Sequence, residues 1–123
     1  MKLTIQRIRL SAWLLLGILL FTSCEKPDNR PQLEFQVVDV QGRSIYGAYA
    51  GLFDSYEGWL SRENPVQVWR TTSNTGEVIF TDLEEKQYFF YVRYGKLDNS
   101  MGQYHLAEPL TINERRIIKV VLQ

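Results

Sequence analysis

The alternation of apolar and polar positions is clearest in the middle of the chain, from Val66 to Tyr94. Apolar residues occupy every second position before and after the segment Ser73–Gly76, which is rich in turn-forming residues. This pattern predicts two strands joined by a tight turn. The aromatic and β-branched run Tyr88–Val92 follows, and both of its faces are apolar. Such a run predicts a central strand that is packed on one side and partly covered on the other.

The same period of two recurs on both sides of this stretch. Further strands are predicted at Leu33–Val40, Ile45–Phe53, Tyr104–Ala107 (a short edge strand) and Arg115–Leu122. Gly47 and Gly51 lie inside the second of these strands and indicate a bulge or a close backbone approach. About seven strands with turns between them, and no segment of helical period, predict an all-β fold: an antiparallel β-sandwich with Greek-key connections.

The direction of the strands predicts which loops share an end of the sandwich. If successive strands alternate in direction, the loops at the end where the chain enters are Asp54–Pro65, Asp82–Lys86 and Glu108–Glu114. The loops at the opposite end are then Gln41–Ser44, Ser73–Gly76 and Gly95–Gln103. We therefore expect Trp59 and Asn74 to lie at opposite ends.

The amino-terminal residues have the pattern of an export signal. Three basic residues precede an apolar run from Leu10 to Phe21. That run is of signal-peptide length and shorter than the ~20 residues of a membrane-spanning helix. We therefore divide the chain into a signal peptide (1–23), a lipidated cysteine with a polar tether (24–32) and a β-sandwich domain (33–123).

Cys24 directly follows the apolar run and is the only cysteine of the chain. The segment Phe21-Thr22-Ser23-Cys24 resembles the lipobox of bacterial lipoproteins. The resemblance implies that the Cys24 thiol carries a diacylglycerol and that the signal is cut before it. It also implies that the new amino group is acylated, with a fatty acid such as palmitate. Two other interpretations of Cys24 stay open: an ordinary cysteine beside a conventional cleavage site, and part of an uncleaved membrane anchor.

The charge balance bears on the partners of the exported chain. The whole sequence has 14 basic and 14 acidic residues, and the signal peptide takes three basic residues with it. The remainder carries 11 basic and 14 acidic side chains, a formal charge of −3. This balance argues against a nucleic-acid partner, which requires a basic face. The expected partners are the membrane, through the lipid anchor, and an envelope protein or a glycan.

Three segments of the domain share turn-and-strand signatures with one family. Val37–Ala48 contains an Asp-x-x-Gly turn before a Gly-Ala strand, Thr71–Leu83 contains a turn that ends in Gly before an alternating strand, and Gln87–Val92 is a Tyr-rich strand. Together they resemble carboxypeptidase-regulatory-like, or transthyretin-like (prealbumin-like), domains. The resemblance implies a seven-stranded transthyretin-like or immunoglobulin-like sandwich. Such a module is often an accessory or spacer in secreted proteins, and it carries no catalytic residue to transfer.

The sequence contains little that indicates a catalysed reaction. His105 is the only histidine, and one histidine with one lipidated cysteine makes neither a transition-metal site nor a Cys-His pair. No nucleophile elbow, phosphate-binding loop or dinucleotide fingerprint is present. The sequence therefore predicts no catalytic residue, no metal and no cofactor.

The aromatic residues of the loop Asp54–Pro65 can be interpreted in two ways. Trp59 and Leu60 could fold back over the open end of the sandwich as a lid on the core. Alternatively, Tyr56 and Trp59 form an exposed stacking surface for sugar rings or for a partner protein, because Trp and Tyr are favoured anchors. Trp69 is interpreted as half-buried packing on the outer face of its strand.

These observations favour a non-enzymatic, lipid-anchored β-sandwich in the envelope of a Gram-negative bacterium. It is expected to act as a binding or structural module in an outer-membrane complex. One alternative is a carbohydrate-binding accessory lipoprotein of a glycan-uptake system, with Tyr56 and Trp59 as the contact residues. Another alternative, from a different class, is an enzyme inhibitor or a small hydrolase.

Overall fold

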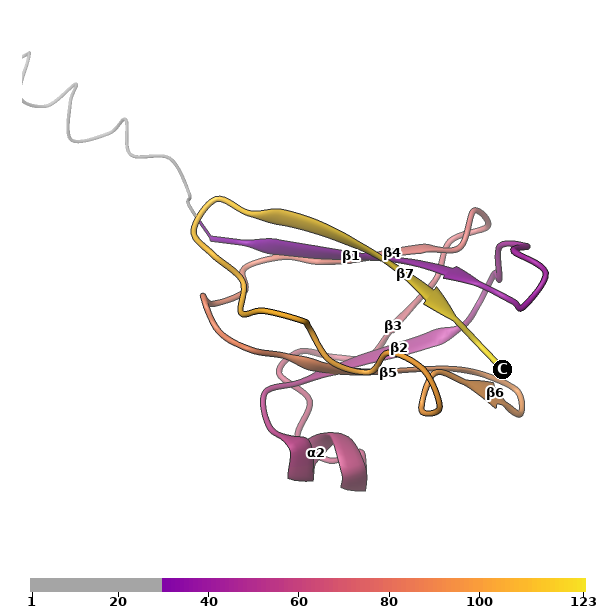
Figure 1. Ribbon diagram of the computed structural model, residues 1–123, viewed down its shortest axis with the longest axis horizontal. Coiled ribbons are helices and arrows are strands. Elements are labelled where there is room, and N and C mark those ends of the chain that lie inside the picture. Colours follow the sequence, from indigo (N-terminus) through magenta and orange to yellow (C-terminus); the bar gives the residue numbers. More distant parts are fainter. Residues whose placement is uncertain (1–29) are drawn as a thin grey trace, which may run out of the picture.

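The computed structural model describes residues 30–123. They form two β-sheets packed face to face, with one short helix beneath the second sheet (Figure 1). The elements are β1 (Gln32–Val38), β2 (Tyr49–Phe53), α2 (Tyr56–Ser61), β3 (Arg70–Thr71), β4 (Glu77–Phe80), β5 (Phe89–Tyr94), β6 (Leu97–Asp98) and β7 (Arg115–Val121). The strand order is β4-β1-β7 in one sheet and β3-β2-β5-β6 in the other. The prediction of an all-β sandwich is confirmed.

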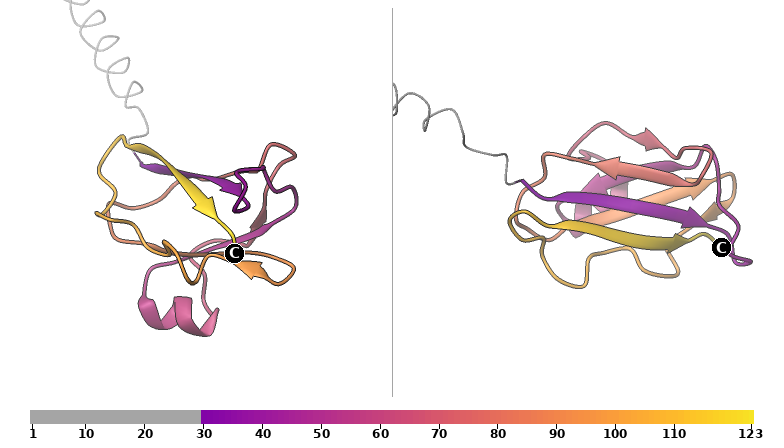
Figure 2. Two further views of the ribbon diagram at one scale, coloured as in Figure 1. Left: turned by 45° about the vertical axis from the view of Figure 1, so that its right-hand side comes forward. Right: turned by 90° about the horizontal axis from the view of Figure 1, so that it is seen from above.

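The three-stranded sheet contains one parallel pair, which the sequence pattern did not predict. β1 lies in its centre, antiparallel to β4 with Leu33 opposite Phe80, and parallel to β7 with Leu33 opposite Arg116. The right-hand view of Figure 2 shows β1 between the other two strands. The reason lies in residues 99–114, which run back along the length of the sandwich before β7 begins (Figure 1). β7 therefore runs in the same direction as β1, as a crossover connection allows.

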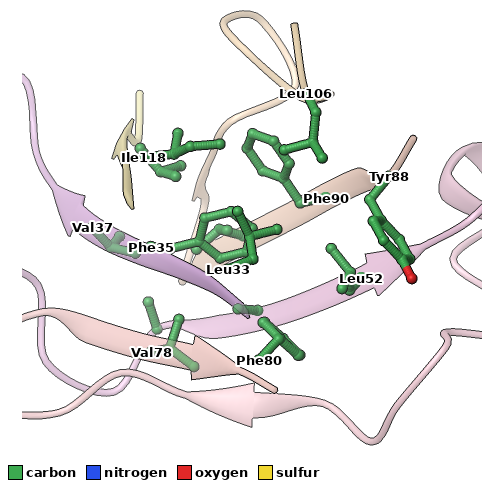
Figure 3. Close-up of a cluster of buried hydrophobic side chains, with 14 of the residues drawn as sticks. Leu33, Phe35, Val37, Leu52, Val78, Phe80, Tyr88, Phe90, Leu106 and Ile118 are labelled. Atoms are coloured by element: carbon green, nitrogen blue, oxygen red, sulfur yellow. The ribbon is translucent and has the colours of Figure 1, made fainter. Parts of the chain in front are cut away.

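The core lies between the sheets and is built from the inward-facing positions of β1 and β5. Phe35 and Phe90 are fully buried, and their ring centroids are 4.6 Å apart (Figure 3). The Phe80 ring packs edge-on against Phe35 at 5.9 Å. Burying a side chain of this size stabilises the fold by about 1.5–3 kcal/mol. The alternating pattern on β1 and the aromatic run on β5 thus supply the two halves of one core.

Two buried polar side chains replace backbone hydrogen bonds at the margins of the sheets. The Thr72 hydroxyl accepts a hydrogen bond from the Ala48 N–H at 2.9 Å and donates one to the Ile45 carbonyl at 2.7 Å. The Asn99 amide accepts from the Val92 N–H at 2.8 Å and donates to the Phe90 carbonyl at 3.0 Å. Asn99 thereby continues the pairing of β5 beyond the end of β6.

The loops occupy the ends that the alternation of strands predicts. The Leu83 N–H donates to the Pro31 carbonyl, and Lys86 pairs with Asp54 at 3.3 Å, all at the end where the chain enters the domain. The Val37 N–H donates to the Gly76 carbonyl at the opposite end. Trp59 and Asn74 therefore belong to loops at opposite ends, as expected.

Several predicted boundaries differ from those observed. The domain begins slightly earlier than expected, since Pro31 is buried and Gln32 belongs to β1. Tyr104–Ala107 makes only an isolated bridge between His105 and Phe89 instead of a strand. The signal peptide 1–23 and Cys24 lie outside the described residues.

Candidate functional site

The outer face of the four-stranded sheet carries a second aromatic layer. Alternation places Ala50, Leu52, Phe90 and Val92 in the core, all fully buried. The intervening positions therefore point outward. They are Tyr49, Gly51 and Phe53 on β2, and Phe89, Tyr91 and Arg93 on β5. Aromatic rings thus cover the outer surface of the two central strands.

The helix α2 covers one half of this aromatic layer. Ser55 caps its start by accepting a hydrogen bond from the Gly58 N–H at 3.0 Å. Trp59 is only 6% exposed, and its indole Nε1–H donates to the Phe90 carbonyl at 2.9 Å. The indole also stacks on Tyr104, with ring centroids 4.4 Å apart and planes inclined by 25°. Trp59 therefore covers the outer face of the sheet and not the open end of the sandwich, so the lid interpretation is wrong in its location.

The predicted contact residues Tyr56 and Trp59 do lie together. Their ring centroids are 5.7 Å apart with an interplanar angle of 27°, and Tyr56 also packs edge-on against Phe89. Tyr56 is 45% exposed, whereas little of Trp59 faces solvent. A ligand-contact role for Tyr56 stays a prediction. The surroundings of Trp59 leave almost none of its ring for a ligand.

The other half of the aromatic layer is open and forms a groove, here called the outer groove. Its volume is about 480 Å³, which is within the range of small-molecule sites. The groove is lined by Tyr49, Arg62, Trp69, Tyr91 and Arg93. Apolar ring faces and two guanidinium groups therefore meet in one concave surface.

Trp69 lies flat against β2 because Gly51 has no side chain. A Cβ at Gly51 would lie 2.7 Å from two ring carbons of Trp69, which is too close for any side chain. The indole also packs edge-on against Phe53 at 5.9 Å and Tyr91 at 6.4 Å. Trp69 keeps 37% of its surface exposed toward the groove. The prediction of half-buried packing on the outer face is confirmed, and the same residue also lines a site.

Arg62 marks the boundary between the covered half and the outer groove. It ends α2 with a left-handed backbone (φ 63°) and donates a side-chain hydrogen bond to the Trp59 carbonyl. Its guanidinium carbon lies 3.5 Å from the ring centroid of Tyr91 and 4.7 Å from that of Trp59. The two rings and the helix end therefore hold the guanidinium in one position.

The carboxylate of Asp98 lies beside the groove, opposite Arg93 in the pairing of β5 with β6. The Asp98 carboxylate accepts hydrogen bonds from the Tyr91 hydroxyl at 3.2 Å and from the Ser100 hydroxyl at 2.6 Å. Burial raises the pKa of Asp98, but the hydrogen bonds from Ser100 and Tyr91 and the positive charge of Arg62 outweigh it. The net effect lowers the pKa of Asp98 below its ordinary value of 3.8. Asp98 thus offsets part of the charge of Arg62 at neutral pH.

Arg93 lines the groove and lies opposite Asp98 in the pairing of β5 with β6. Its guanidinium carbon lies 5.8 Å from the ring centroid of Tyr49. Within residues 30–123, no carboxylate forms an ion pair with it. An anionic group entering the groove would therefore find an available partner in Arg93.

The remaining chemistry-bearing residues belong to packing or turns. His105 packs against Phe89 and Tyr104, and its Nδ1 lies 2.9 Å from the Leu106 carbonyl. In the part of the chain that the structure describes, no three or more His, Cys, Asp or Glu residues group as metal ligands. Among residues 30–123, no helix has the length and apolar character needed to cross a bilayer.

Part of the outer groove is predictable from the sequence pattern. Alternation along the second and fifth strands places Tyr49, Gly51, Tyr91 and Arg93 on the same outer face, and the glycine indicates a close approach. Arg62 carries no such signal, because its position depends on the helix that the sequence pattern did not reveal.

Three solved structures share this fold. The TIE protein of Bacillus anthracis is 17% identical with a TM-score of 0.52, and the match covers 77% of this chain and 16% of that chain. Hydroxyquinol 1,2-dioxygenase from Pseudomonas putida DLL-E4 is 9% identical with a TM-score of 0.55, over 80% of this chain and 57% of that one. BcpA, the major pilin subunit of Bacillus cereus, is 13% identical with a TM-score of 0.52, over 77% and 30%.

These likenesses define the class of the protein as a β-sandwich module. No protein-family model matches the chain, and no curated protein matches its sequence. At 9–17% identity the likeness shows the fold alone. The chain spans between 16% and 57% of the length of the three proteins. The candidate site of this sandwich is the outer groove.

Proposed function

We propose that this chain is a non-enzymatic binding module, held by a lipid on Cys24 to the outer membrane of a Gram-negative bacterium, as part of an envelope complex. The observation that carries the binding role is the outer groove, which two exposed aromatic rings line together with Arg93, an exposed arginine that forms no ion pair within residues 30–123. The resemblances to bacterial lipoproteins and to carboxypeptidase-regulatory-like domains support the anchoring and the accessory role.

The fold fits a domain held close to a bilayer. Cys24 is six residues before Arg30, where the described chain begins, so an extended tether spans only about 20 Å. The chain enters at one end of the sandwich, and its carboxyl terminus lies at the opposite end (Figure 1). Two or three acyl chains would hold such a domain firmly, at about 0.8 kcal/mol per buried CH₂.

Anchoring is tested by metabolic labelling of the full chain with palmitate, followed by membrane fractionation. The natural chain is expected to carry the label and to sediment with membranes, whereas Cys24→Ser loses both properties. Trp69→Ala is the matched control, because it alters only the outer groove and keeps the label. An unlabelled natural chain, or a labelled Cys24→Ser variant, would overturn the anchor.

Carbohydrate retention is the second candidate function, and the outer groove favours it over the loop that carries Tyr56 and Trp59. Tyr49 is 50% exposed and Trp69 is 37% exposed, so both rings offer surface on which a sugar can lie. A glycan array probed with the full chain tests this. Trp69→Ala is expected to lose the retained glycans, whereas Tyr56→Ala keeps them. If Tyr56→Ala instead loses the glycans and Trp69→Ala keeps them, the sugar site lies at α2 and not in the outer groove.

A further inference from the structure

The charges of the outer groove differ from those of the domain that carries it. Residues 30–123 contain ten basic and twelve acidic side chains, so the described domain is acidic overall. Arg62 and Arg93 nevertheless line one depression, and Asp98, which lies opposite Arg93 in the pairing of β5 with β6, accepts hydrogen bonds from Tyr91 and Ser100. A local positive charge on an acidic domain favours anionic ligands at that place.

We propose that the outer groove binds a carboxylate-bearing sugar, such as a uronic acid unit of an acidic polysaccharide. This inference rests on the proposed binding role of the groove and is independent of the lipid anchor. The apolar face of the sugar ring lies against Trp69 and Tyr49. The carboxylate pairs with Arg93, and Arg62 adds a second positive charge at the other side of the groove.

The aromatic part of the groove is pre-organised for a flat, partly apolar ligand. Trp69 is fixed by Gly51 beneath it and by edge contacts to Phe53 and Tyr91. An aromatic side chain that is already fixed loses little conformational entropy when a ligand binds. Sugar rings have one face of C–H groups and a rim of hydroxyls, which suits an aromatic floor with a polar rim.

The cationic part of the groove selects for a carboxylate. The Arg93 guanidinium is a planar fork whose two parallel N–H groups match the two oxygens of a carboxylate. Arg62 is stacked over Tyr91, so stacking fixes its plane while Asp98 offsets part of its charge. We therefore assign the main anion contact to Arg93. The hydroxyl of Tyr91 is already donated to Asp98 and does not serve the ligand.

The test uses the full lipidated chain in detergent micelles. The probes are oligogalacturonates, oligomannuronates and hyaluronan fragments, each paired with its methyl ester, which keeps the ring and removes the charge. Calorimetry measures the affinity, and tryptophan fluorescence, to which Trp59 and Trp69 both contribute, reports on the aromatic layer. At least one acid is expected to bind about tenfold more tightly than its ester, which is the size of one charge-assisted contact.

The variants separate the ring contact from the charge contact. Arg93→Gln is expected to weaken the acid about tenfold and to leave the ester unchanged, whereas Trp69→Ala weakens both. Lys119→Gln, an exposed charge on the three-stranded sheet, is the matched control and changes neither.

The possible results test the charge contact, the ring contact and the sugar assignment separately. Equal binding of acid and ester, unaffected by Arg93→Gln, would overturn the acidic-sugar assignment and leave the groove as a neutral-glycan site. Binding that survives Trp69→Ala would move the site away from the groove. If no probe binds at millimolar concentration, the sugar assignment is overturned, while the palmitate test of the anchor stands by itself.

Discussion

Gly51 and Trp69 pack closely against each other beneath the outer groove: a Cβ on Gly51 would lie 2.7 Å from the indole. The two residues are eighteen positions apart in sequence and belong to β2 and the segment before β3. Gly51 is not in the left-handed region of backbone space, so no backbone conformation requires a glycine there. Its small size is therefore used to let the ring lie against the strand.

Gly51→Ala is expected to displace Trp69 and to lower the free energy of unfolding by about 1–3 kcal/mol, the usual cost of overpacking. Trp69→Ala removes the clash, so Gly51→Ala should cost far less in that background. Chemical denaturation of the four proteins of this double-mutant cycle measures the coupling. Gly102→Ala is the control, since its Cβ would meet nothing closer than 3.9 Å. Additive effects of Gly51→Ala and Trp69→Ala would contradict the assigned contact.

The strands of the core could be predicted because their alternation directly encodes burial. Leu33, Phe35 and Val37 repeat with a period of two and are all fully buried. The segment Val66–Trp69 has the same period but forms only one backbone hydrogen bond to the sheet, from the Val66 N–H to the Leu52 carbonyl. Its Val68 side chain is 76% exposed. An alternating pattern is therefore not sufficient where no neighbouring strand is available to pair with it.

The helix α2 could not be predicted because its six residues are too few to show a helical period. It ends at Arg62, a residue with positive φ at a position where glycine is the usual signal. Its stability comes from Trp59 packing on β5, a contact between distant parts of the sequence. The parallel pairing of β1 with β7 depends in the same way on the path of the chain between the strands.

Thr72 is predicted to stabilise the fold through its hydroxyl. Thr72→Val preserves the shape of the side chain but leaves the Ala48 N–H and the Ile45 carbonyl without this partner. The free energy of unfolding should fall by about 1–3 kcal/mol, since buried polar groups would lose their hydrogen bonds. Thr71→Val, at the exposed neighbouring position, should change stability little. Equal effects of the two substitutions in denaturant titrations would contradict this role.

Asn99 is predicted to protect the backbone of β5. Asn99→Ala removes the acceptor of the Val92 N–H and one donor to the Phe90 carbonyl, at a cost of about 1–3 kcal/mol. Hydrogen exchange at the Val92 amide should become faster, a local effect that a general loss of stability does not single out. Asn74→Ala, in the exposed turn before β4, is the control. An unchanged exchange rate at Val92 would show that β5 does not depend on this side chain.

Asp98 is predicted to make the stability fall in acid. Its pKa in the folded state is lowered, so the ionised carboxylate stabilises the fold above the pKa of the unfolded chain. This stabilisation is lost as the pH falls through the lower, folded-state pKa. Asp98→Asn should therefore be less stable than the natural chain at neutral pH and show a shallower decline below about pH 4.

Urea denaturation between neutral pH and about pH 2 measures this difference. Glu108→Gln is the control, because Glu108 is an exposed carboxylate outside the groove, and it should keep the slope of the natural chain. If Asp98→Asn also keeps that slope, the hydrogen bonds from Tyr91 and Ser100 do not stabilise the ionised form.

Trp59 is predicted to be a structural residue, in contrast to Trp69 in the outer groove. Trp59→Phe removes the hydrogen bond to the Phe90 carbonyl, which still accepts one from Asn99, so the cost should be only about 0.5–1.5 kcal/mol. Trp59→Ala removes the whole buried ring and should cost about 3–5 kcal/mol. Tyr56→Ala should cost less than Trp59→Ala, because Tyr56 is 45% exposed.

Ligand binding distinguishes this structural role from direct contact. Trp59→Phe leaves the Trp59 carbonyl and an aromatic ring beside Arg62, so the affinity of the outer groove for its ligand should stay within about twofold of that of the natural chain. Trp69→Ala, by comparison, should weaken binding strongly, at a cost in stability comparable to that of Gly51→Ala, since the indole packs on Gly51, Phe53 and Tyr91. Calorimetry and denaturation on the same three proteins give both quantities. A Trp59→Phe variant of natural stability that fails to bind would make Trp59 a ligand contact, because the lost indole N–H would then have acted on the ligand and not on the fold.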